Sequence, residues 1–226
     1  MAKRLRVTLE IGPKGKRFVA VAPDWPGLER GARTEEAALE SLRAYVTRYL
    51  PIAKLAGMKA EYDDIAGHRV VERYPGSGST DFWGISFAYS TIDQRPLSDN
   101  DLERELALMK ACWKFFDNVR SRVSAEMALG PRGGGRDRDR IVRHTLAAEL
   151  DWARKVGVNS SWEAVQTDKG LAAHRKAYCD GIRLCHAEGR LARKWPLRYL
   201  VRHTAFHTLD HAWEMEDKDL TGKPVA

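Results

Sequence analysis

The pattern of apolar residues changes near residue 95 of this 226-residue chain, and the change limits the folds that the chain can adopt. Before residue 95, short runs alternate between apolar and polar residues and are separated by turn sequences, which indicates β-strands. After it, apolar residues recur every three or four positions over long stretches, which indicates helices that bury one face. We therefore expect an α+β protein, with one domain at residues 1–95 and a helical domain at residues 96–226.

The first part is expected to begin with a β-hairpin. Gly12-Pro13-Lys14-Gly15 is a turn sequence between two alternating runs. Thr34 is a candidate N-cap, because the acidic residues after it suit the positive end of a helix that runs to about Ala56. We expect Trp83 to pack. Strands are expected at Leu5–Ile11, Arg17–Ala22, Leu28–Ala32, His68–Tyr74 and Phe82–Tyr89.

The second part is expected to contain four helices. Ser98 followed by Asp101 is a capping-box sequence that opens a helix. Pro196 suits the first position of the last helix. Four helices with one apolar face each predict a bundle. The helices are expected from Ser98 to about Val123, at Arg140–Val156, at Leu171–Ala187 and from Pro196 to about Glu216.

Composition excludes few classes of function. Lys and Arg number 38 against 31 Asp and Glu, so the net charge of +7 permits an anionic partner without requiring one. The three cysteines form no CxxC pair, which favours reduced thiols in the cytosol over disulfides or a thiolate metal site. The N-terminus has no apolar signal segment, and no apolar run is long enough to cross a bilayer. We expect a cytoplasmic protein without a membrane partner.

Histidines in the last predicted helix are the strongest functional signal. His207 and His211 are four residues apart, so on a helix both imidazoles reach the same side and can bind one metal ion. His144, among apolar positions of the second predicted helix, is the best candidate for a third ligand. His203 lies four residues before His207, so the pair 203/207 remains an alternative to 207/211. The other interpretation is three unrelated histidines, on the surface or hydrogen-bonded in the core.

Residues 98–218 resemble the DinB-like superfamily, which includes mycothiol-dependent maleylpyruvate isomerases and bacillithiol transferases. The resemblance rests on the position of His144 and on the segment Phe206-His207-Thr208-Leu209-Asp210-His211-Ala212-Trp213-Glu214. It implies an up-down-down-up four-helix bundle with a metal site that takes one histidine from the second helix and two from the last. It also implies, more weakly, a low-molecular-weight thiol as cofactor.

Residues 5–60 resemble HicB-like antitoxin domains. The resemblance is carried by Phe18-Val19-Ala20-Val21-Ala22-Pro23-Asp24-Trp25-Pro26-Gly27 and by the helix start Thr34-Glu35-Glu36-Ala37. It implies a three-stranded sheet, a helix and a further strand. The chain departs from the antitoxins because no ribbon-helix-helix or helix-turn-helix segment follows.

These observations predict a DinB-like metalloprotein, plausible as a thiol- or water-activating transferase, isomerase or hydrolase acting on a small molecule. Zinc suits three imidazoles best, with nickel, iron and manganese left open. The alternative is a non-enzymatic regulatory or interaction module whose HicB-like half binds a protein partner or forms a homodimer. A nucleic-acid partner is not favoured. Candidates for a catalytic base are Glu149 and Glu214, and candidates for cofactor binding are Arg198 and Arg202, in a basic region near the last helix.

Overall fold

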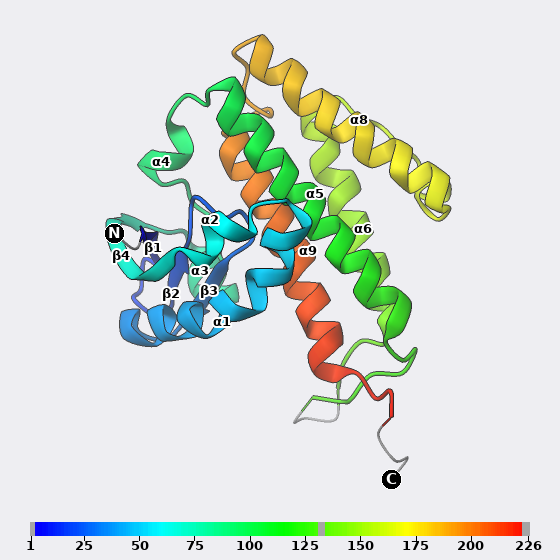
Figure 1. Ribbon diagram of the computed structural model, residues 1–226, viewed down its shortest axis with the longest axis horizontal. Coiled ribbons are helices and arrows are strands. Elements are labelled where there is room, and N and C mark those ends of the chain that lie inside the picture. The colour runs from blue at the N-terminus through cyan, green and yellow to red at the C-terminus, as the bar shows by residue number, and fades with distance from the viewer. Residues whose placement is uncertain (1–2, 131–133, 223–226) are drawn as a thin grey trace. The chain divides into compact units, whose positions relative to one another are not determined.

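The computed structural model describes residues 3–130 and 134–222 of the chain (Figure 1). The chain divides into two compact units. Unit 1 comprises residues 1–111 and 196–206, and unit 2 comprises residues 112–195 and 207–226. A sheet and helices occur together, so the protein is α+β as expected. The domain boundary expected after residue 95 stays a prediction.

A four-stranded mixed sheet lies in unit 1, with the strand order β3-β2-β1-β4 (Figure 1). β1 pairs antiparallel with β2, β2 pairs antiparallel with β3, and β4 adds parallel to β1. The hairpin and the third and fourth strands expected from the sequence are therefore confirmed. The strands are β1 (Lys3–Ile11), β2 (Phe18–Val21), β3 (Glu29–Ala32) and β4 (Ile65–Pro75).

Helix α1 (Glu35–Leu55) follows β3 and packs against β2 and β3. The hydroxyl of Thr34 accepts a hydrogen bond from the Ala37 amide at 3.2 Å, so the predicted N-cap is confirmed. Leu42 and Ile52 are among the residues that α1 buries. A short helix, α2 (Lys59–Asp63), leads into β4.

The segment after β4 differs from the prediction. A strand was expected at Phe82–Tyr89, but the chain forms α3 (Gly78–Trp83), a loop and α4 (Thr91–Gln94). A capping box between Ser77 and Thr80 starts α3, and Gly84 ends it in the left-handed conformation at φ 70°. The prediction of a strand is therefore wrong.

Glu10 explains why this segment is not a strand. Its carboxylate is fully buried and accepts hydrogen bonds from the amides of Phe87 and Ala88 at 3.0 and 3.1 Å and from the Ser86 hydroxyl at 2.6 Å. The Thr80 hydroxyl and the Tyr74 phenol also donate to it. In a strand, the amides of Phe87 and Ala88 would donate to a neighbouring strand. Here they donate instead to the buried carboxylate of Glu10.

A second buried charge of unit 1 is the guanidinium of Arg202. It donates to Asp93 at 2.7 and 2.9 Å and to the Ala88 carbonyl at 3.1 Å. One nitrogen also lies 3.3 Å from Glu29. Arg202, Asp93 and Glu29 are each at most 2% exposed, so the guanidinium and the Asp93 carboxylate compensate each other out of water, with the Glu29 carboxyl group beside them.

Unit 2 is helical in the residues that the structure describes. α5 (Asp99–Arg122) and α9 (Leu197–Lys218) each contribute one part to each unit. The remaining elements are α6 (Arg138–Ala153), η1 (Arg154–Val156), α7 (Trp162–Val165) and α8 (Asp168–Ala187). The four expected helices are therefore present, while their arrangement as an up-down-down-up bundle stays a prediction.

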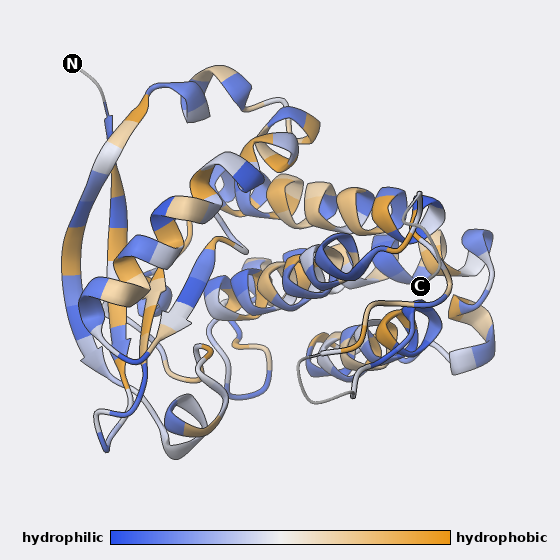
Figure 2. Ribbon diagram, turned by 90° about the horizontal axis from the view of Figure 1, so that it is seen from below, coloured by the Kyte–Doolittle hydropathy of each residue, from blue (hydrophilic) through white to orange (hydrophobic). Residues whose placement is uncertain are grey.

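The helices carry apolar residues on part of their surface, seen as orange beside blue in Figure 2. In unit 2, Leu146 and Leu150 of α6 pack with Val165 of α7 and Leu171 of α8. The three cysteines, Cys112, Cys179 and Cys185, form no disulfide and are buried. Among the described residues, no helix combines the length and the apolar character needed to span a bilayer.

We expect Arg202→Met to lower the free energy of unfolding by about 3–5 kcal/mol, because it leaves the Asp93 carboxylate buried without its counter-charge. Urea denaturation followed by circular dichroism measures the change. Arg190→Met, at an exposed arginine paired with Glu188, is the control and should leave the midpoint unchanged. Equal midpoints for Arg202→Met and the wild type would show that the buried charges contribute nothing.

Stability should fall as the pH rises through the neutral range. Burial raises the pKa of Glu29 and of Glu105 to about 8, from an ordinary value of 4.5. Between these values the unfolded chain has lost both protons and the folded chain keeps them, so each group lowers the free energy of unfolding as the pH rises. Glu105→Gln should flatten this slope between about pH 5 and pH 8, measured by urea denaturation at several pH values. A variant slope as steep as that of the wild type would contradict the prediction.

Candidate metal centre

Three histidines of unit 2 come together between α6 and α9. His144 Nε2 lies 3.2 Å from His207 Nε2. One ring nitrogen of each of His144, His207 and His211 lies within 4.8 Å of the other two. The residues named from the sequence as metal ligands are therefore brought into one cluster.

Helix geometry accounts for the placement. His207 and His211 are one helical turn apart on α9, and their ring centroids are 4.5 Å apart at an interplanar angle of 86°. His144 comes from α6, whose first turn is held by Asp137, the N-cap that accepts from the Arg140 amide at 2.7 Å. The His144 ring lies 5.0 Å from that of His207 and 4.9 Å from that of His211. Two rigid elements thus carry the three imidazoles.

The separation of the His144 and His207 nitrogens fits a shared metal ion. In tetrahedral zinc sites with Zn–N bonds near 2.0–2.1 Å, ligand nitrogens lie about 3.3 Å apart. The His144–His207 separation of 3.2 Å is close to that value. His144 is exposed, whereas His211 is 9% exposed, so the cluster opens to solvent on the side of His144. Three protein ligands with one accessible side are typical of catalytic rather than structural zinc sites.

Glu214 contacts the His211 ring at Nδ1. His211 Nδ1 lies 2.8 Å from Glu214 Oε2, and Lys218 donates to the other carboxylate oxygen at 2.6 Å. The bond to His211, helped by Lys218, lowers the pKa of Glu214 to about 2. A carboxylate so stabilised accepts a hydrogen bond from Nδ1–H of His211, which leaves Nε2 as the nitrogen that can bind a metal. It is also a poor proton acceptor near neutral pH, which does not favour Glu214 as a catalytic base.

The electrostatics of His144 favour the neutral ring that metal binding requires. Burial lowers its pKa below 6.5, and the neighbouring His211 and Arg136 act in the same direction. Trp152, also on α6, presents its ring to His207 at 5.0 Å and 82°, which gives the cluster an apolar wall. Sequence reasoning did not identify Trp152 or Lys218. Lys218 could have been found from its position four residues after Glu214, since oppositely charged residues at that spacing pair on a helix.

His203, the alternative ligand, has a different environment. Its ring stacks on Tyr199 at 5.2 Å and 17°, and Phe87 lies 5.9 Å away. It is not among the residues whose nitrogens converge with those of His144 and His207. The geometry thus favours the pair 207/211.

The second candidate base, Glu149, lies in a buried ion pair. Arg175 Nε donates to it at 3.0 Å, and Arg175 also donates to Asp117 of α5 at 2.6 Å. The Glu149 carboxylate is 3.6 Å from Nε2 of His174. The Nδ1 atom of His174 lies 2.9 Å from the Ser160 hydroxyl. These contacts join α5, α6 and α8. A catalytic role for Glu149 stays a prediction, and its contacts indicate a structural one.

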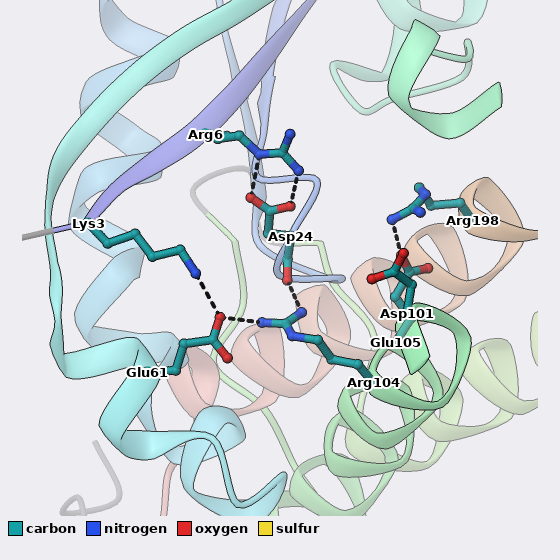
Figure 3. Close-up of a pocket in the computed structure, with 8 residues that line it drawn as sticks. All are labelled: Lys3, Arg6, Asp24, Glu61, Asp101, Arg104, Glu105 and Arg198. Atoms are coloured by element: carbon teal, nitrogen blue, oxygen red, sulfur yellow. Dashed lines mark hydrogen bonds and ion pairs between the residues drawn. The ribbon is translucent and has the colours of Figure 1, made fainter. Parts of the chain in front are cut away.

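The candidates for cofactor binding, Arg198 and Arg202, are both engaged within unit 1. Arg202 is buried among the carboxylates described above. Arg198 pairs with Glu105 and lines a cavity of about 310 Å³ (Figure 3). Cofactor binding by either residue stays a prediction.

The charges that line this cavity largely compensate one another. Lys3 and Arg104 both donate to Glu61, at 3.0 and 3.1 Å, and Arg6 clamps the carboxylate of Asp24 (Figure 3). Acidic and basic residues occur in equal numbers in the lining: Lys3, Arg6, Arg104 and Arg198 with Asp24, Glu61, Asp101 and Glu105. Most of the charged groups in the lining are therefore paired with one another.

Comparison with family models, with curated proteins and with solved structures finds no match to this chain. The argument for function therefore rests on the geometry of the three histidines and on the contacts around them.

Proposed function

We propose that this protein binds one divalent metal ion through His144, His207 and His211 and that the site is catalytic in type. The observation that carries the proposal is the convergence of three imidazole nitrogens from two helices within 4.8 Å. The accessible side at His144 and the carboxylate behind His211 also support it. Zinc is the favoured ion because neutral imidazoles suit it, and nickel, iron and manganese are the alternatives.

We assign the chain to the DinB-like kind of metalloprotein as part of the same proposal, with a HicB-like first part. The order and the helix placement of the histidines support the former, and the succession of β1, β2, β3, α1 and β4 supports the latter. A divalent ion held by His144, His207 and His211 would supply Lewis-acid activation of a thiol or a water molecule near neutral pH. Glu214 orients the His211 ring, and Trp152 excludes water on the side of His207.

We expect untagged protein, loaded with zinc and then dialysed, to retain about one metal ion per chain by elemental analysis. His144→Ala, His207→Ala and His211→Ala should each abolish the stoichiometric retention of zinc, because two imidazoles hold zinc much less tightly than three. The helical circular dichroism signal should remain. His68→Ala, at a partly buried histidine on β4, is the control.

Two results would overturn the ligand set. One is wild-type protein that retains no zinc after loading. The other is loss of zinc in His203→Ala together with full retention in His211→Ala. That result would assign the ligand pair to His203 and His207.

Glu214→Gln should weaken zinc binding by about 10–100-fold without abolishing it, because the carboxylate behind a histidine ligand orients the ring and raises its basicity. Competition with a chromogenic chelator measures the affinity. Glu216→Gln, at a carboxylate on the same helix that pairs with Arg122, is the matched control. Equal affinities for Glu214→Gln and the wild type would remove Glu214 from the site.

The thiol part of the proposal has a separate test. A low-molecular-weight thiol that binds at an open metal position should raise the melting temperature of zinc-loaded wild type and leave that of His144→Ala unchanged. A shift of the same size in both proteins would place thiol binding elsewhere. No shift with any thiol would favour water as the activated ligand or a non-enzymatic role.

A further inference from the structure

Two adjacent aromatic side chains stand out from unit 1 at the end of α3. Phe82 is 72% exposed and Trp83 is 64% exposed. Their rings contact each other edge to face, with centroids 4.6 Å apart at 79°. The expectation that Trp83 packs is therefore wrong, because its ring is exposed and contacts the similarly exposed Phe82 ring. Large apolar side chains exposed side by side are typical of a surface that meets a partner.

The backbone that carries these rings is firmly held. Asp81 accepts hydrogen bonds from the amides of Lys14, Lys16 and Arg17, at 2.7, 2.9 and 3.2 Å, so α3 is tied to the β1–β2 turn. On the other side of α3, Thr80 donates to the buried Glu10. The exposure of the rings is therefore fixed by the fold.

The Asp81 side chain lies close against Gly12, and the backbone of Gly84 lies close against Gly31. A Cβ atom on Gly12 would lie 2.1 Å from Asp81 Oδ1, and one on Gly31 would lie 1.9 Å from the carbonyl oxygen of Gly84. Only glycine fits at either position. The turn before β2 and the third strand are thus shaped to receive α3.

The same hydrogen bonds bring positive charge beside the rings. Lys14 and Lys16 are exposed, and the side chain of Arg17 lies along Gly84, the residue after Trp83. Three cationic residues thus donate backbone hydrogen bonds to the single carboxylate of Asp81. We call Lys14, Lys16, Arg17, Phe82 and Trp83 the aromatic-basic turn. Its partner is expected to be anionic and to accept apolar rings.

The charge disfavours a second copy of this chain as the partner. In a two-fold interface each residue meets the same patch of the other copy, so the lysines and the arginine would face one another. The ring geometry disfavours a single-stranded nucleic acid. Successive bases stack on rings that are spaced along a groove, whereas Phe82 and Trp83 touch edge to face and form a single wedge.

We propose that the aromatic-basic turn binds anionic lipid bilayers peripherally. Phe82 and Trp83 enter the interfacial layer, where aromatic rings are favoured, and Lys14 and Lys16 contact the lipid headgroups. Insertion of a short wedge together with headgroup contacts gives reversible binding to the membrane surface. The proposal is independent of the metal site, and it replaces the expectation from the sequence that the protein has no membrane partner.

Co-sedimentation with vesicles tests the proposal. Wild type should bind vesicles of phosphatidylcholine with about a third phosphatidylglycerol and should not bind phosphatidylcholine alone. Phe82→Ser with Trp83→Ser should weaken binding at least about tenfold, because the variant loses the favourable free energy of moving each ring from water into the membrane. Lys14→Ser with Lys16→Ser should weaken it by about 30-fold at low salt. Circular dichroism shows that each variant is folded.

Leu184→Ser with Leu191→Ser is the matched control, because both leucines are about as exposed as the rings, at 54% and 53%. This variant should bind as wild type does. The proposal is overturned if wild type does not bind anionic vesicles or if the leucine variant loses as much binding as the aromatic one. Binding of single-stranded RNA that depends on Trp83 and exceeds vesicle binding would assign the turn to nucleic acid instead.

Discussion

Buried charge, and the need to compensate it, organises unit 1. Glu10 is fully buried on β1 and is satisfied by donors from the chain segment that follows β4. Arg202 is buried on α9 and is satisfied by Asp93 and Glu29. A buried ion without such partners would cost several kcal/mol, so these groups admit few other arrangements of the backbone around them. The loop 84–90 owes its shape to this requirement more than to any local preference.

The parts of the fold that the sequence predicts correctly are those whose signals are local. The β1–β2 hairpin has alternation and a turn, and α1 has its Thr34 cap. The region of Phe82–Tyr89 fails because its decisive partner, Glu10, is more than 70 residues away in the chain. A pattern of alternating apolar residues does not reveal that the amides of this region will bond to a distant carboxylate rather than to a neighbouring strand.

The same distinction applies to the candidate metal centre. The spacing of His207 and His211 is a local property of a helix, and the closeness of their rings follows from it. The choice of His144 needed the apolar face of α6 and a family resemblance, because no spacing links residues 63 positions apart. The roles of Trp152 and Glu149 depend on which faces of the helices meet, and the sequence does not state this. Glu149 looked available for proton transfer, yet Arg175 holds it.

The division of α9 between the two units has a practical consequence for dissecting the protein. Arg202 belongs to unit 1 and His207 to unit 2, although they lie within two turns of one uninterrupted helix. A fragment truncated after β4 and α4 would carry Asp93 and Glu29 without their guanidinium. Co-expression of complementary fragments, or a circular permutation that keeps α9 whole, would respect this shared element, whereas residues 1–95 or 96–226 expressed alone would lack one side of the contacts between Arg202 and its acidic partners.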